Sequence, residues 1–169
     1  VEPALAQLKA HPPAGPDWGW EVKWDGYRLA VHIEPRGVRI LTRNGHDWTH
    51  RFPAIAQAAR ALGPASMIID GEAVVLDEEG RSDFGLLQQS LGASGKKLGN
   101  CASDAILYAF DLMYLDGHDL RGMEYRSRRH LLEETLNGQD GAIRLSEELD
   151  ADPALLLEHA RHLGLEGII

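Results

Sequence analysis

The octapeptide Glu21-Val22-Lys23-Trp24-Asp25-Gly26-Tyr27-Arg28 contains the residues best suited to chemistry. It places Lys23 at the end of an apolar-flanked strand and follows it with the turn-forming pair Asp25-Gly26. Only a neutral amine is nucleophilic, and a free lysine is neutral in about one molecule in a thousand at pH 7, so such a site must favour the neutral form. Arg28 adds a forked cation that could hold a phosphate beside the amine. The pattern fits nucleotidyl transfer, and on these residues alone a surface hairpin fits it equally well.

Acidic residues interrupt several β-prone runs further along the chain. Asp70 and Glu72 flank a glycine, and residues two apart in a strand face the same side of a sheet, so their carboxylates should project together. Asp111 ends a similar apolar run, and Glu166 begins the last one. Polar residues inside such runs are typical of functional sites. The alternative for each position is a solvent-exposed sheet face or a carboxylate paired with a neighbouring arginine.

The rest of the chain predicts the elements that must position these side chains. Alternating apolar residues predict strands, and helical spacing with capping residues predicts helices. Pro53 suits a first helical turn, Ser82 or Asp83 could cap a helix, and Asp152 suits a cap before Pro153. The expected strands are 27–33, 38–42, 67–76, 105–115 and 166–169, the expected helices are 52–62, 83–91, 127–136 and 153–163, and 92–100 is expected to be a mobile loop.

The short connections and the irregular order of these elements favour antiparallel pairing over a parallel βαβ sheet. The predicted fold class is therefore α+β, with antiparallel β-sheets flanked by helices. At 169 residues, with 44% hydrophobic and 25% charged residues, the chain fits one ordinary globular domain. No apolar run approaches the roughly 20 residues that cross a bilayer, which predicts a soluble, cytoplasmic protein without membrane partners. The single Cys101 is expected to be a small packing residue.

The net charge of -9 argues against a protein that coats nucleic acid nonspecifically, because such binding depends on basic residues. A local basic patch is still compatible with this charge. A cluster of four arginines could be a solvated helix face that pairs with Glu133 and Glu134, or it could contact nucleic acid. Its members are Arg121, Arg126, Arg128 and Arg129.

Five segments, in order, resemble the motifs of the covalent nucleotidyltransferases, which include ATP-dependent DNA ligases, RNA ligases and mRNA capping enzymes. The first is the lysine-x-aspartate-glycine-x-arginine signature of the octapeptide. The others are Thr42-Arg43-Asn44-Gly45, Asp70-Gly71-Glu72, Tyr108-Ala109-Phe110-Asp111-Leu112 and Glu166-Gly167-Ile168. In the tryptophan of its first motif and the Arg43-Asn44-Gly45 form of the next, the chain most resembles bacterial ATP-dependent DNA ligases, especially the ligase module of multifunctional end-joining ligases.

The resemblance implies a nucleotidyltransferase fold with an ATP-grasp-like core and an adenylation reaction with ATP as cofactor. It implies that a lysine becomes lysyl-AMP, that other side chains bind adenine, ribose and phosphate, and that carboxylates hold Mg²⁺ or Mn²⁺. Carried over to this sequence, the resemblance makes Lys23 the nucleophile. It implies that Glu21 and Val22 meet adenine, that Phe110 stacks on it, and that Arg28 and Glu72 contact ribose. It also implies that Arg43 lies near the phosphates or the DNA 5′-phosphate, and that Glu166 with Glu72 binds the metal.

The chain also departs from the family pattern. The motif with paired lysines should follow Ile169, and neither it nor an oligonucleotide-binding-fold domain is present. The resemblance thus implies one adenylation domain over residues 1–169, incomplete at its C-terminus, within a longer polypeptide of a bacterial cytoplasm that acts on nicked double-stranded DNA. An RNA ligase or capping enzyme, and a noncatalytic nucleotide-binding module, are the alternatives.

Overall fold

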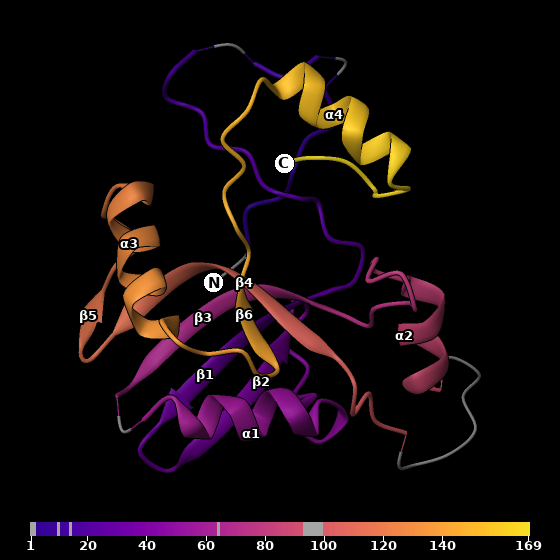
Figure 1. Cartoon of the computed structure of the whole chain (residues 1–169). Helices are drawn as coiled ribbons and strands as arrows, with labels where there is room; N and C mark the ends of the chain where they lie inside the picture. Colours follow the sequence, from indigo (N-terminus) through magenta and orange to yellow (C-terminus); the bar gives the residue numbers. More distant parts are fainter. Residues whose placement is uncertain (1–2, 10, 14, 64, 93–99) are drawn as a thin grey trace.

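The computed structural model describes residues 3–9, 11–13, 15–63, 65–92 and 100–169. Its centre is a sheet in the order β2-β1-β3-β4-β5, with β6 added on β4 (Figure 1). The strands are β1 (Tyr27–Glu34), β2 (Gly37–Thr42), β3 (Met67–Val74), β4 (Ile106–Leu115), β5 (His118–Asp119) and β6 (Ile143–Leu145). The helices are η1 (Thr49–Arg51), α1 (Pro53–Ala61), α2 (Phe84–Ser90), α3 (Tyr125–Leu136) and α4 (Pro153–His162).

The predicted α+β class is confirmed, and the predicted antiparallel pairing is mostly right. Strand β1 lies between β2 and β3, and β4 pairs with β3 and β5, always antiparallel. Strand β6 is the exception, because it runs parallel to β4. The sheet is therefore mixed, and the sequence did not indicate β6.

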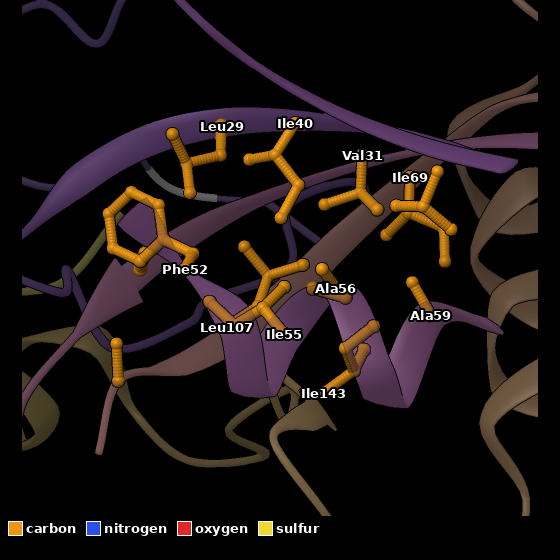
Figure 2. Packing of buried hydrophobic residues seen from close by; sticks show 14 of the residues in the cluster. Leu29, Val31, Ile40, Phe52, Ile55, Ala56, Ala59, Ile69, Leu107 and Ile143 are labelled. Carbon is orange, nitrogen blue, oxygen red and sulfur yellow. The ribbon is translucent and has the colours of Figure 1, made fainter. Parts of the chain in front are cut away.

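Helix α1 packs against one face of the sheet. Leu29, Val31 and Ile69 alternate along β1 and β3 and are fully buried. They pack with Ile55 and Ala59 of α1, as Figure 2 shows. Because successive side chains of a strand point to opposite faces, residues such as Arg28 and Glu72 must lie on the other face. Figure 1 places α4 on the side of the sheet away from α1.

The helix boundaries follow the expected caps closely. Pro53 and Pro153 each stand at the start of their helix. The Asp83 side chain accepts a hydrogen bond from the Leu86 amide at 3.0 Å, and Asp152 caps α4 in the same way, with the Ala154 amide at 2.9 Å. These bonds satisfy amides that have no partner within the helix, which explains why the helices begin here.

Some expectations are wrong or lie outside the described residues. The last segment, 166–169, is not a strand but a single bridge between Ile168 and Val22, because so few residues pair there. Cys101 is exposed and is therefore not a packing residue. Residues 93–99 of the expected mobile loop are not described. Within the described residues, no helix has the length and apolar character needed to cross a membrane.

Candidate active site

The segment that carries Lys23 is held by residues from the opposite end of the chain. The Glu21 amide donates to the Ile169 carbonyl and the Ile169 amide donates back, both at 2.9 Å. The Lys23 amide donates to the Gly167 carbonyl at 2.9 Å. These bonds fix the backbone on which the candidate nucleophile stands, and they place the last motif beside the first.

Two motif glycines are required by close approaches between strands. A Cβ added to Gly26 would lie 2.1 Å from the Ala73 carbonyl oxygen, and one added to Gly71 would lie 2.7 Å from the Tyr108 carbonyl oxygen. Both distances are far below van der Waals contact, so any larger residue would push the strands apart. Gly26 therefore serves the packing of the segment that carries Lys23 on β3, beyond the turn that the sequence predicts.

Carboxylates surround the Lys23 amine. Its ammonium forms an ion pair with Glu166, and the two side chains are 36% and 42% exposed, so a ligand can reach them. Burial raises the pKa of Glu72 to about 7, although the nearby charges of Arg28 and Lys23 oppose the shift. Burial and then the charge of Glu166 raise the pKa of Asp25. The Glu166 carboxylate thus lies close to Glu72 and Asp25 as well as to Lys23, which brings several oxygen ligands together beside the amine.

Arg28 is held by Asp70 rather than by Glu72. Its Nε and Nη2 donate to the two Asp70 oxygens at 3.1 and 2.8 Å, and its Nη1 donates to the Ala4 carbonyl. Its guanidinium lies 5.1 Å from the centre of the Phe110 ring, so it covers part of that ring. The arginine-paired alternative is therefore correct for Asp70. The ribose role of Arg28 remains a prediction.

Arg43 lines a cavity next to Arg28 rather than the surroundings of Lys23. The cavity has a volume of about 460 Å³ and lies against β1, β2 and β3, with Arg28, Arg43 and Asp70 in its wall. Arg43 itself is exposed. The Arg43 guanidinium is thus accessible to an anion that enters the cavity beside Arg28.

The model of a protein family described as the ATP dependent DNA ligase domain matches residues 4–169. The chain belongs to this family. It is 47% identical over 171 residues to the multifunctional non-homologous end joining protein LigD of Pseudomonas aeruginosa, covering the whole chain and 19% of that protein. It is 38% identical over 167 residues to the corresponding DNA repair protein of Mycobacterium tuberculosis, covering 98% of the chain and 20% of that protein.

Solved structures agree with this assignment. The mycobacterial DNA ligase D complexed with ATP and MES has a TM-score of 0.74 and 36% sequence identity, and the match covers 89% of this chain and 46% of that chain. The chain spans about a fifth of the length of these LigD relatives. The RNA-ligase and capping-enzyme alternative is not favoured, because the family and these relatives are DNA ligases.

The sequence did not indicate the partners of Glu21, which include Tyr125, a residue that it did not single out. The Glu21 side chain is buried and faces α3, where it accepts hydrogen bonds from the Tyr125 hydroxyl at 2.6 Å and from Arg129 at 3.3 Å. Arg129 shares its buried face of α3 with Leu132 and Leu136. That three- and seven-residue spacing marks Arg129 as an inward-facing arginine, and it could have been recognised in the sequence.

The four clustered arginines of the ligase chain are mostly engaged with protein groups. Arg129 pairs with Glu133 as expected, but also with Glu21. Glu134 pairs with His130 instead of an arginine. The other members bind a carboxylate or a carbonyl: Arg121 pairs with Asp119, Arg128 with Asp111, and Arg126 donates to the Pro16 carbonyl. The expected solvated helix face is therefore largely wrong, because Arg129 alone of the four pairs with one of the two expected glutamates, and it is buried. For Asp111, the alternative of a carboxylate paired with an arginine is correct.

The metal prediction rests on Glu72 and Glu166. Across the described part of the ligase chain, no group of three or more histidine, cysteine or acidic residues is arranged to hold a metal ion. Two carboxylates near one lysine still fit a magnesium ion, which proteins often hold through one or two carboxylates together with waters and substrate phosphates. Both glutamates contribute to the charge around Lys23, so the donor set suits such an ion.

Proposed function

We propose that this chain is the adenylation part of an ATP-dependent DNA ligase and that Lys23 is the residue that becomes covalently linked to AMP. The observation that carries the proposal is the arrangement of Lys23, whose amine pairs with Glu166 and whose backbone is bonded to Gly167. The first and the fifth of the motif-like segments thereby meet at one amine. Membership of the ATP-dependent DNA ligase family supports the same reaction.

The chemistry begins with a lysine that is paired as an ammonium. Before it reacts, Lys23 must lose its proton and its ion pair with Glu166. Deprotonating an unperturbed lysine at pH 7.5 costs about 4 kcal/mol, so the occupied site must favour the neutral amine by a similar amount. Nζ then forms a bond to the α-phosphorus of ATP as the bond to pyrophosphate breaks. AMP passes to the 5′-phosphate at a nick, and attack by the 3′-hydroxyl releases it and joins the strand.

The surrounding residues have assigned roles in this proposal. Phe110 stacks on adenine, with Glu21 and Val22 beside the base. Arg28 and Glu72 bind the ribose, which requires Arg28 to share or exchange its contact with Asp70. Arg43 binds a phosphate, either of the nucleotide or of the DNA 5′ end, from the wall of the adjacent cavity.

Glu166 and Glu72 would hold Mg²⁺ or Mn²⁺, which when bound would neutralise phosphate charge. The DNA partner is a nicked duplex, bound by a longer protein that carries further domains and acts in the bacterial cytoplasm during end joining. The LigD relatives, of which this chain matches about a fifth, support that wider setting.

Mass spectrometry after incubation with ATP and magnesium tests the proposal. The expected result is one added AMP, located on Lys23 by peptide sequencing and removed by excess pyrophosphate, which reverses the step. A protein that stays unmodified at saturating ATP, or that carries AMP on another residue, would contradict it. Incubation with GTP in place of ATP is the matched control for the choice of base.

A further inference from the structure

Ser146 lies directly after β6 and is 1% exposed. Its amide donates to the Ala109 carbonyl of β4 at 2.8 Å, so its backbone is fixed on the central sheet. Its hydroxyl accepts a hydrogen bond from the Trp24 indole nitrogen at 3.1 Å. Its carbonyl oxygen accepts a hydrogen bond from Arg129, which also donates to the Glu21 carboxylate at 3.3 Å. One buried residue is therefore connected to two residues close to Lys23, to Trp24 directly and to Glu21 through Arg129.

The two residues that Ser146 joins stand on either side of Lys23. Glu21 lies two positions before the nucleophile and Trp24 one position after it. Trp24 is also held by its ring, which stacks on Tyr108 of β4 with centroids 3.7 Å apart and planes inclined by 8°. The stack fixes the plane of the indole, and the hydrogen bond to Ser146 fixes its rotation within that plane.

The Glu21 carboxylate completes the network towards α3. It is 8% exposed, and it accepts hydrogen bonds from Tyr125 and Arg129. Burial raises the pKa of Glu21, while the hydrogen bond from Tyr125 and the charge of Arg129 lower it. Arg129 also donates to the Ser146 carbonyl, so the guanidinium holds both Glu21 and the backbone of Ser146. These residues form one connected set, in which Ser146 bonds Trp24 on one side of Lys23 and shares Arg129 with Glu21 on the other.

We propose that Ser146 is a positioning residue for adenylation, which holds Lys23 in line with its target by bonding to Trp24 directly and by connecting to Glu21 through Arg129. The inference rests on the proposed function and names a residue outside the five ligase motifs. Ser146 touches neither the amine nor any group that changes its bonding. It acts through the backbone of residues 21–24, so its loss should lower the rate of the chemical step and leave ATP affinity almost unchanged.

Ser146→Ala is the first variant, because it removes the hydroxyl and leaves the buried volume nearly unchanged. Trp24→Phe keeps a ring that can stack on Tyr108 and removes only the indole donor. Single-turnover formation of lysyl-AMP from α-labelled ATP gives the rate, and calorimetric titration gives the ATP dissociation constant. We expect Ser146→Ala to slow the step by about tenfold and to change ATP affinity by less than about twofold. The slowing in the double variant, relative to wild type, should be far smaller than the product of the two single effects.

Thr135→Val is the matched control for loss of a hydroxyl. Thr135 is half-buried on α3 and bonds the Leu131 carbonyl at 2.7 Å, outside the network. Its variant should adenylate at the wild-type rate. An unchanged rate in Ser146→Ala, a loss confined to ATP affinity, or fully multiplicative effects with Trp24→Phe would each overturn the positioning role.

A separate readout keeps this inference distinct from the proposed function. If the wild-type chain forms no lysyl-AMP, the proposed function fails, and positioning is then judged by NMR of the Lys23 side chain and the Trp24 indole. Broadened Lys23 signals and faster indole hydrogen exchange in Ser146→Ala, with Thr135→Val unchanged, would support positioning. Wild-type spectra for both groups in Ser146→Ala would overturn it.

Discussion

Glu72→Gln should change how the stability of the chain depends on pH. Burial raises the pKa of Glu72 from 4.5 to about 7, so the folded state binds this proton more tightly than the unfolded state does. The resulting stabilisation is fully present below pH 4.5, declines as the pH rises through the window up to about 7, and is absent above it. Glutamine has the same shape as the protonated glutamate and cannot ionise, so the variant should lack this decline.

The size of the effect follows from the two pKa values. At about 1.4 kcal/mol per pKa unit, a rise from 4.5 to about 7 corresponds to about 3 kcal/mol of unfolding free energy. The wild type and Glu72→Gln should therefore have similar stability at pH 4.5, and the variant should be more stable by about 3 kcal/mol at pH 8. Other carboxylates titrate in the same window, so the informative quantity is the difference between the two proteins.

Urea unfolding followed by tryptophan fluorescence at several pH values between 4.5 and 8 measures this difference. Glu78→Gln is the matched control, because Glu78 is an exposed glutamate just beyond β3. Its curve should run parallel to that of the wild type at every pH. A Glu72→Gln curve that is also parallel to the wild type would refute the argument that burial raises the pKa of Glu72 in the folded protein.

Three further outcomes are expected. Lys23→Ala and Lys23→Arg should both lose the label from α-labelled ATP, since guanidinium stays protonated, and label retained in either would identify another acceptor. Arg129→Met should lower the unfolding free energy by about 3 kcal/mol in urea titrations because it strands a buried carboxylate, whereas the exposed Arg126→Met should cost under about 0.5 kcal/mol. The 169-residue chain should bind ATP but not seal nicked DNA, since it matches only 46% of the solved ligase chain; sealing at rates equal to a lengthened chain would contradict this.

Much of the fold could be predicted because local signals and burial agree. Alternation in β1 and β3 marks the face that packs on α1, and Asp83 and Asp152 mark their helix starts. Strand β6 has only Ile143–Leu145, which is too short to show a period, and its parallel partner β4 lies far away in sequence. Such a strand is defined by tertiary pairing, which a single sequence does not display.

The sequence indicates which charged residues belong to the candidate site. It does not indicate with which residues they form hydrogen bonds and ion pairs. The register places Glu72 directly opposite Arg28 and Asp70 opposite Ala30. The long Arg28 side chain nevertheless reaches its diagonal neighbour Asp70, a choice that depends on side-chain length and burial rather than on motif spacing. Glu21 likewise turns toward α3 because Arg129 and Tyr125 offer it donors there. The sequence names the charged residues, and packing decides which of them meet.

The pairing of residues 21–23 with residues 167–169 has a consequence for the order in which the protein matures. A ribosome releases Lys23 long before it synthesises Glu166, and the sheet under the lysine can form in the meantime from β1, β2 and β3. Contacts between distant segments generally form late, because closing the chain between them is entropically costly. Lys23 of a nascent chain is therefore an ordinary solvated side chain, and the candidate site around it is assembled only when the last of these residues has emerged.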